Sequence, residues 1–256
     1  MNPELCPICS GPRDLAFSRV ILGEYQAQYL KCPQCGFLGA LNPTWLDQAY
    51  ESPIAVVDSG VLARAKDLEP RLLCLFSLNF PKGSVYVDIG AGYGALVRTM
   101  RDAGLDFRWS DPNCPNLLAP GFELDSQACS GLTAIEVLEH TTDPVAFLEG
   151  AISRTGAPVV FLTTELLPTP IPDPDSWWYY AFSTGQHLSF FEKRTLGILA
   201  EQLGFRLRSR HSLHVLHQGQ IQPWTFLLAT TRLAPVVGAF IRHSLASLTQ
   251  ADNPLL

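Results

Sequence analysis

Four cysteines in two CxxC pairs give the strongest chemical signal at the N-terminal end of the sequence. The pairs are Cys6 with Cys9 and Cys32 with Cys35. A CxxC turn presents two thiolates to one side of a metal ion, and two such turns complete a tetrahedral four-sulfur site. Because this ligand set leaves no open coordination position, we expect a structural Zn²⁺ ion. A redox-active pair is the alternative.

A glycine-rich segment with two aspartates is the second signal. Residues 87–94 read VDIGAGYG and contain Asp88, Gly90, Gly92 and Gly94. Alternating glycines let the backbone turn sharply and approach a ligand closely, and Asp111 ends the next expected strand, where its carboxylate can accept hydrogen bonds from both ribose hydroxyls. The charge of Asp88 would repel a pyrophosphate but suits a cationic group. The segment also fits the GxGxxA pattern, so a nicotinamide cofactor and an NAD(P)-dependent oxidoreductase stay open as alternatives.

Two carboxylates and two imidazoles form a third set, namely Glu136, Glu139, His140 and His187. Such a set could hold a divalent ion with open positions for substrate hydroxyls. The alternative is that Glu139 and His140 cap and orient the next helix. His187 could act as a general base, or could only hydrogen-bond the backbone. Our candidate catalytic residues are His187, Glu139 and His140.

These residues require a scaffold of alternating strands and helices. Buried-type strands are expected at 84–89, 107–110, 132–138 and 158–163, and helices at 58–78, 95–103 and 196–203. A helix with Thr142 or Asp143 as its cap and Pro144 in its first turn follows the third strand. Residues 205–212 and 224–229 are expected to be a closing pair of strands. The alternation predicts an α/β fold with a mostly parallel sheet. Residues 17–29 read as β-structure turning at Gly23, and the aromatic run 177–182 is expected to cover a substrate pocket.

Several segments resemble the class I S-adenosylmethionine-dependent methyltransferases. Residues 88–94 (DIGAGYG) resemble their first motif, and 110–112 (SDP) the acidic end of their second strand. Residues 135–144 (IEVLEHTTDP), 185–191 (GQHLSFF) and 203–205 (LGF) are similar to a bacterial branch that includes quinone-biosynthesis O-methyltransferases. The cysteine pairs resemble the zinc ribbon that precedes methyltransferases of sugar and secondary-metabolite pathways.

This resemblance implies a Rossmann-like class I methyltransferase sheet with helices on both faces, preceded by a small zinc ribbon. The implied domains are the ribbon at 1–44, the methyltransferase domain at 45–232 and a C-terminal helical tail at 233–256. The implied activity is methyl transfer from S-adenosylmethionine to a small molecule. O-methylation of a sugar, quinone-like ring or natural-product intermediate is favoured over C-methylation. The implied cofactor residues are Asp88, Gly90, Gly92, Gly94, Asp111 and Glu136.

Composition narrows the choice of partners and compartment. The 256 residues are 47% hydrophobic, which is ample for a core and excludes a wholly disordered chain. A net charge of −6 argues against nucleic acid, so an RNA methyltransferase that binds RNA through the ribbon is only an alternative. We expect no membrane span and no secretory signal, and therefore a reducing cytoplasm. Residues 233–248 are expected to form an amphipathic helix for packing or for a homodimer. A non-catalytic binding module is a further alternative.

Overall fold

The computed structural model describes residues 5–51, 60–125 and 128–253. Its contacts divide the chain into two compact units. The first comprises residues 1–55, 136–151 and 162–216, and the second comprises residues 56–135, 152–161 and 217–256. The glycine-rich segment lies in the second unit, whereas the two sets of potential metal ligands lie in the first.

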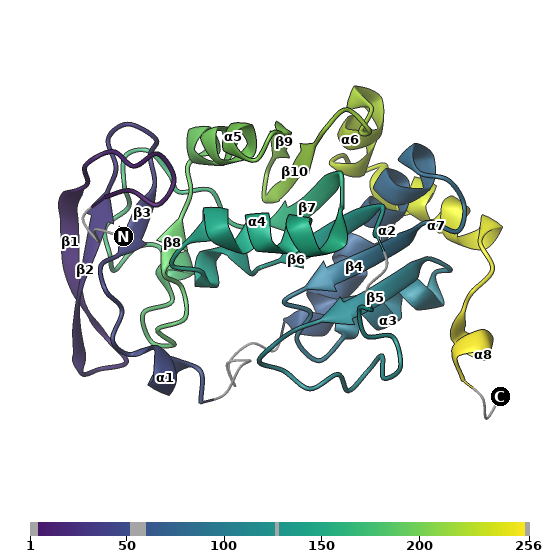
Figure 1. Ribbon diagram of the computed structural model, residues 1–256, viewed down its shortest axis with the longest axis horizontal. Helices are drawn as coiled ribbons and strands as arrows, with labels where there is room; N and C mark the ends of the chain where they lie inside the picture. The colour runs from purple at the N-terminus through teal and green to yellow at the C-terminus, as the bar shows by residue number, and fades with distance from the viewer. Residues whose placement is uncertain (1–4, 52–59, 126–127, 254–256) are drawn as a thin grey trace. The chain divides into compact units, whose positions relative to one another are not determined.

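A six-stranded sheet has the strand order β5-β4-β6-β7-β10-β9 (Figure 1). Strand β4 (Val85–Ile89) pairs in parallel with both β5 (Asp106–Ser110) and β6 (Gly131–Ile135). The other strands are β7 (Val159–Thr163), β9 (Arg206–Arg210) and β10 (Leu213–His217). Strands β4, β6 and β7 are almost wholly buried, as apolar parallel strands with helices on their faces must be. The predicted Rossmann-like α/β class is confirmed.

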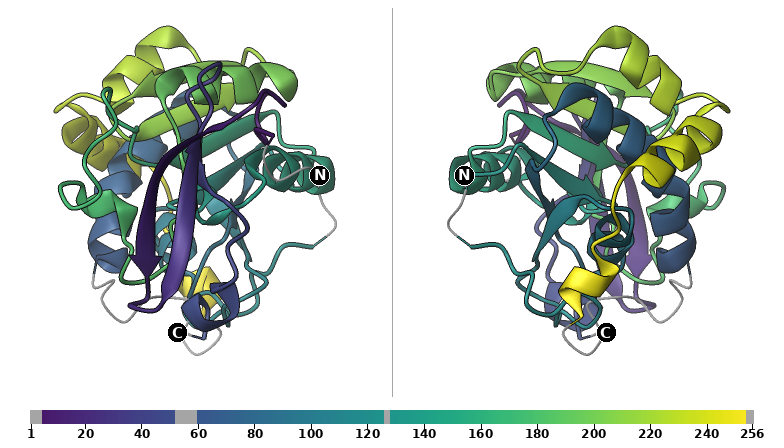
Figure 2. Two further views of the ribbon diagram at one scale, coloured as in Figure 1. Left: turned by 90° about the vertical axis from the view of Figure 1, so that its left-hand side faces the viewer. Right: turned by 90° about the vertical axis from the view of Figure 1, so that its right-hand side faces the viewer.

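Helix α2 (Val61–Asn79) packs against three other helices of the second unit, α3 (Ala95–Asp102), α6 (Pro223–Ala229) and α7 (Ala234–Ser244). It stays one helix through Pro70, where α7 approaches so closely that a Cβ on Gly238 would lie 2.5 Å from the proline ring. Residues 58 and 59, expected to begin this helix, lie outside the described residues. Figure 2 shows the chain running from α7 to α8 (Thr249–Asp252).

Two expectations about secondary structure were wrong. Residues 224–229 belong to helix α6, because Pro223 occupies its first turn and the face that bears Phe226 and Ala229 is buried while Trp224 is 58% exposed. Strand β6 ends at Ile135 rather than at residue 138, because Glu136 has a φ of 53° and breaks the extended backbone. Residues 138–140 then form a single 3-10 turn, η1.

The described residues include no single helix that is long and apolar enough to cross a membrane. Helices α6 and α7 meet that test only as a pair, and they are bent by 104° at the break between them.

The first unit contains a four-stranded sheet with the order β1-β2-β3-β8. Strands β1 (Asp14–Ile21) and β2 (Tyr25–Lys31) form the expected hairpin around Gly23. Strand β3 (Leu38–Ala40) pairs with β2 and also with β8 (Ser189–Phe190), so a distant segment supplies the fourth strand. The remaining elements are α1 (Leu46–Ala49), α4 (Pro144–Thr155), η2 (Trp178–Tyr180) and α5 (Lys193–Gln202).

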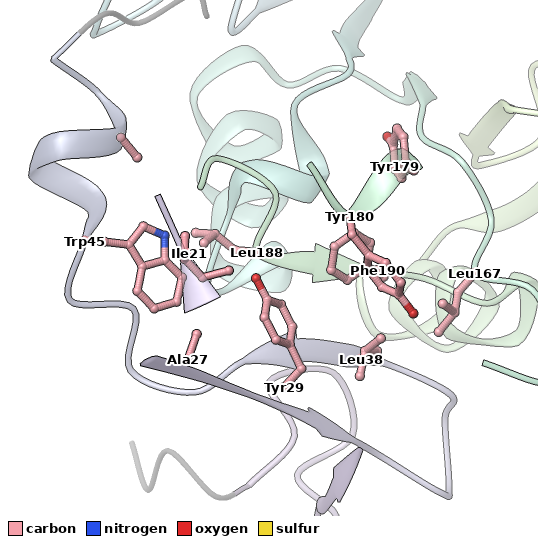
Figure 3. Packing of buried hydrophobic residues seen from close by; sticks show 11 residues of the cluster. Ile21, Ala27, Tyr29, Leu38, Trp45, Leu167, Tyr179, Tyr180, Leu188 and Phe190 are labelled. Carbon is pink, nitrogen blue, oxygen red and sulfur yellow. The ribbon is translucent and has the colours of Figure 1, made fainter. Parts of the chain in front are cut away.

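Aromatic residues from the N-terminal hairpin region and from residues 179–190 pack into one core in the first unit (Figure 3). Tyr29 of the hairpin and Trp45 pack in the same cluster as Tyr179, Tyr180 and Phe190. The indole Nε1 of Trp45 also donates to the backbone oxygen of Gly185 at 2.8 Å. Tyr179 and Tyr180 are each 1% exposed, so these two members of the aromatic run are core residues rather than a loop that covers a pocket.

Candidate functional site

The two CxxC pairs converge on one point. The Sγ atoms of Cys6 and Cys35 are 3.4 Å apart, and so are those of Cys9 and Cys32. All four Sγ atoms lie within 4.8 Å of one another. Tetrahedral Zn²⁺ with Zn–S bonds of about 2.3 Å places its sulfurs about 3.8 Å apart. The residues therefore fit a four-thiolate zinc site, with Cys6, Cys9, Cys32 and Cys35 as its ligands.

Backbone hydrogen bonds close a turn around each cysteine pair. The N–H of Gly36 donates to the oxygen of Cys32 at 3.0 Å, and the N–H of Ser10 donates to that of Cys6 at 2.8 Å. The thiol of Cys35 hydrogen-bonds to Cys6 and lowers the pKa of Cys6 to about 5. The hydroxyl of Thr195 donates to the backbone oxygen of Cys35 at 2.7 Å, which ties the second knuckle to α5.

The glycine loop connects β4 to α3 in the second unit. Gly90, Gly92 and Gly94 have φ values of 70°, 54° and 89°, in the left-handed region where a side chain is strained. Asp111, after the end of β5, accepts a hydrogen bond from the N–H of Gly92 at 2.8 Å through Oδ2. The indole Nε1 of Trp109 donates to the oxygen of Gly92 at 2.8 Å. The structure thus brings Asp111 into direct contact with the glycine loop.

Asp88 lies at the end of β4 and is 3% exposed. The parallel register places Thr133 of β6 opposite it, and the Thr133 hydroxyl donates to Asp88 Oδ1 at 2.6 Å. The pKa of Asp88 is raised to about 7, chiefly by burial and to a smaller extent by the charge of Asp111, while the hydrogen bond from Thr133 acts in the opposite direction. Thr133 was not identified from the sequence, although the strand pairing of the glycine motif would have located it.

Glu136 and Glu139 share one phenol in the first unit. The Tyr179 hydroxyl lies 2.6 Å from Glu139 Oε1 and 3.1 Å from Glu136 Oε2. Burial, and then the charge of Glu136, raises the pKa of Glu139 well above its usual value. Burial and the charge of Glu139 likewise raise the pKa of Tyr179. Nothing in the sequence pairs Tyr179 with these glutamates, because packing of the aromatic core places it there.

The two histidines lie next to Glu139. The rings of His140 and His187 have centroids 5.0 Å apart at an interplanar angle of 88°. His187 Nδ1 is 2.6 Å from the backbone oxygen of Tyr179, and His140 Nδ1 is 3.2 Å from the Tyr50 hydroxyl. Asp143, one of the two caps expected for the following helix, fills that role, since its Oδ1 accepts the N–H of Ala146 at 3.0 Å at the start of α4.

Among the described residues, Glu139, His140 and His187 each offer a ligand atom within 4.8 Å of the other two. Glu136 was expected as a fourth member but is not in this group. Its positive φ and the hydrogen bond from its N–H to Thr163 Oγ1, at 3.1 Å, fix its backbone, and its carboxylate accepts from Tyr179.

The sequence matches the model of one known protein family. The sequence model of a family described as "Methyltransferase domain" matches residues 62–210, more than half of the chain. A search of curated protein sequences finds no significant match.

Three solved structures illustrate the likeness. The mitomycin 7-O-methyltransferase is 17% identical, with 69% of this chain and 60% of that chain covered and a TM-score of 0.46. The human N-acetylserotonin methyltransferase is 16% identical over 68% of this chain and 66% of that chain, with a TM-score of 0.46. The magnesium protoporphyrin IX methyltransferase from Synechocystis is 14% identical, with 68% of this chain and 90% of that chain covered and a TM-score of 0.41.

The chain spans about 60% of the length of the first of these proteins. The family match favours the methyltransferase interpretation of the glycine pattern over an NAD(P)-dependent oxidoreductase. The chain belongs to the family described as "Methyltransferase domain".

Proposed function

We propose that this chain transfers a methyl group from S-adenosylmethionine to an oxygen atom of a small molecule. The acceptor we favour is a sugar, a quinone-like ring or a natural-product intermediate, with carbon as the second choice of methylated atom. The observation that carries the proposal is the glycine loop after β4, held to the Asp111 carboxylate through Gly92. Ligands of open α/β folds bind at this carboxyl edge of the strands.

On this proposal the loop and its aspartates hold the cofactor. Gly90, Gly92 and Gly94 let the backbone approach the methionine end, and Asp111 accepts hydrogen bonds from the ribose hydroxyls. Asp88, buried near the end of β4, is assigned to the methionine end together with these glycines. Glu136 follows the carboxyl end of β6, the strand that pairs with β4 beside Asp88, and we assign it to the cofactor on that connectivity. S-adenosylmethionine, when bound, supplies an activated methyl group on a sulfonium.

The acceptor side is assigned to Glu139, His140 and His187. A backbone oxygen can only accept, so the contact of His187 Nδ1 with Tyr179 places a proton on Nδ1. A neutral ring then keeps its lone pair on Nε2, where it can take a proton from an acceptor hydroxyl. Glu139 and His140 lie beside that ring, each with a ligand atom within 4.8 Å of one of its nitrogens. Alignment of acceptor and donor would be the main contribution to rate.

Calorimetric titration of the zinc-replete protein with S-adenosylhomocysteine tests the cofactor assignment. We expect micromolar binding that Asp111→Ala weakens at least about tenfold, because charged hydrogen bonds contribute about 1.5–3 kcal/mol each. Asp111→Asn, which keeps an acceptor oxygen, should weaken binding less. The matched control is Asp67→Ala, an aspartate on the exposed face of α2. Absence of binding, with NADH fluorescence changing instead on mixing, would overturn the proposal.

A further inference from the structure

We propose that Glu139, His140 and His187 bind one first-row divalent metal ion, distinct from the zinc of the cysteine site. Each residue offers a ligand atom within 4.8 Å of the other two. One carboxylate with two imidazoles is a donor set that such ions accept, and it leaves coordination positions open. The cysteine set differs because four thiolates complete their ion's shell.

An unpartnered oxygen points to a missing ligand. Glu139 is 0% exposed, and its Oε1 accepts the Tyr179 hydroxyl at 2.6 Å. Its other oxygen, Oε2, is buried and has no hydrogen-bond partner among the described residues. A buried carboxylate oxygen without a partner is unfavourable, because it has lost its hydration and gained nothing in exchange. A cation between Glu139 and the two imidazoles would remove that cost.

Each histidine has a hydrogen-bond partner at its Nδ1 atom, which is a common arrangement for histidines that bind a metal ion. In metal sites the second ring nitrogen commonly donates to a carbonyl or other acceptor, which fixes the tautomer and turns the first nitrogen toward the ion. His187 has this arrangement, with Nδ1 2.6 Å from the oxygen of Tyr179. His140 has the Tyr50 hydroxyl 3.2 Å from Nδ1. The near-perpendicular rings, with centroids 5.0 Å apart, allow one nitrogen from each to reach a common point.

A metal here would change how the acceptor is activated, and this consequence rests on the proposed methyl transfer. A hydroxyl bound at an open position of a divalent ion loses its proton more readily than a free hydroxyl. His187 would then act as a ligand, and the hydroxyl proton would pass to water. The acceptors that benefit most are those with two neighbouring hydroxyls or a hydroxyl beside a carbonyl, because both oxygens can occupy the open positions.

Metal analysis tests the site directly. The full chain is loaded with Zn²⁺, freed of loose ions by gel filtration and analysed by mass spectrometry for metal per chain. We expect two ions in the unmodified protein and one in Glu139→Gln and in His187→Gln. The control His243→Gln, an exposed histidine on α7, should retain two. One ion in the unmodified protein, or two in both variants, would overturn the proposal.

A second probe distinguishes the two sites and guards against misfolding. Mn²⁺ prefers oxygen and nitrogen over thiolate ligands. A mild chelator first removes the ion at Glu139, His140 and His187 and leaves one zinc per chain at the cysteines. Titration of this protein with Mn²⁺ should then reduce the spin-resonance signal of the aqueous ion, and His187→Gln should abolish that effect. Circular dichroism and the zinc retained at the cysteine site report whether each variant folds. Binding of S-adenosylhomocysteine is measured on the same samples, so failure of the cofactor assignment is seen separately from failure of the metal site.

Discussion

Asp88 and Glu139 are both buried carboxyl groups, but they are supported in different ways. Asp88 is satisfied by Thr133, which the parallel register of β4 and β6 places opposite it. Glu139 lies in a 3-10 turn, and its partner Tyr179 comes from a segment 40 positions later in the chain. The first arrangement follows from strand pairing alone. The second depends on the aromatic core of the first unit.

The two carboxyl groups therefore depend on different contacts for their positions. Strand pairing is repeated along a whole sheet, so Asp88 keeps its partner as long as β4 and β6 pair. The partners of Glu139 are held by packing between the hairpin and the segment 179–190, since Tyr29, Trp45, Tyr179 and Phe190 share one cluster. The segment that carries the four cysteines, called the ribbon below, is continuous with that cluster through β2 and β3. The ribbon is therefore expected to support the Glu139 site.

Cys32→Ser should have the largest effect. Loss of one thiolate removes the zinc and with it about 5 kcal/mol or more of folding free energy, because structural zinc contributes directly to the folding of small domains. Tryptophan fluorescence should change as the core around Trp45 loosens. The free energy of unfolding is measured in urea, and the zinc content per chain is measured on the same samples. Cys114→Ser is the matched control, since Cys114 is outside the cysteine cluster and only partly buried. Equal stability of the two variants would show that the ribbon does not support this core.

Asp88→Asn should have the next largest effect, and it should depend on pH. The pKa of Asp88 is raised from 3.8 to about 7 by burial, so between these values the folded state binds more protons than the unfolded state. Stability contributed by this group is then present below about pH 4 and lost as the pH rises toward 7. At pH 8 the charged form costs up to about 4 kcal/mol, which asparagine avoids.

Urea unfolding of both proteins at pH 5 and pH 8 measures this effect. The stability advantage of Asp88→Asn should grow with pH, while the exposed control Asp67→Asn shows no such trend. A constant difference between Asp88→Asn and the unmodified protein would contradict the raised pKa. Weaker binding of S-adenosylmethionine by Asp88→Asn is expected in parallel, because the sulfonium of that proposed cofactor is cationic.

The same contrast explains how much the sequence could predict. The glycine loop, Asp111 and the cysteine pairs were identified because their spacing is local and repeats a known geometry. The association of Glu139 with His140 and His187 was anticipated as a set, but Tyr179 and Tyr50 were missed. No spacing links a tyrosine to a glutamate across a folded core. Residues 224–229 were assigned as a strand because their apolar run fits either element, and only burial of one face shows the helix.

Tyr179→Phe should have the smallest of these effects and is the sharpest test of the Glu139 arrangement. It removes the hydroxyl that Glu139 Oε1 and Glu136 Oε2 share, and leaves both oxygens without that donor. Loss of a donor to a buried acceptor costs about 1–3 kcal/mol. The neighbouring Tyr180→Phe removes a hydroxyl that donates to the backbone oxygen of Pro172 at 3.0 Å, and should cost about 1 kcal/mol. If the two variants unfold at the same urea concentration, the carboxylates do not depend on Tyr179. If Tyr179→Phe is less stable only after metal removal, a bound cation satisfies the carboxylates in its place.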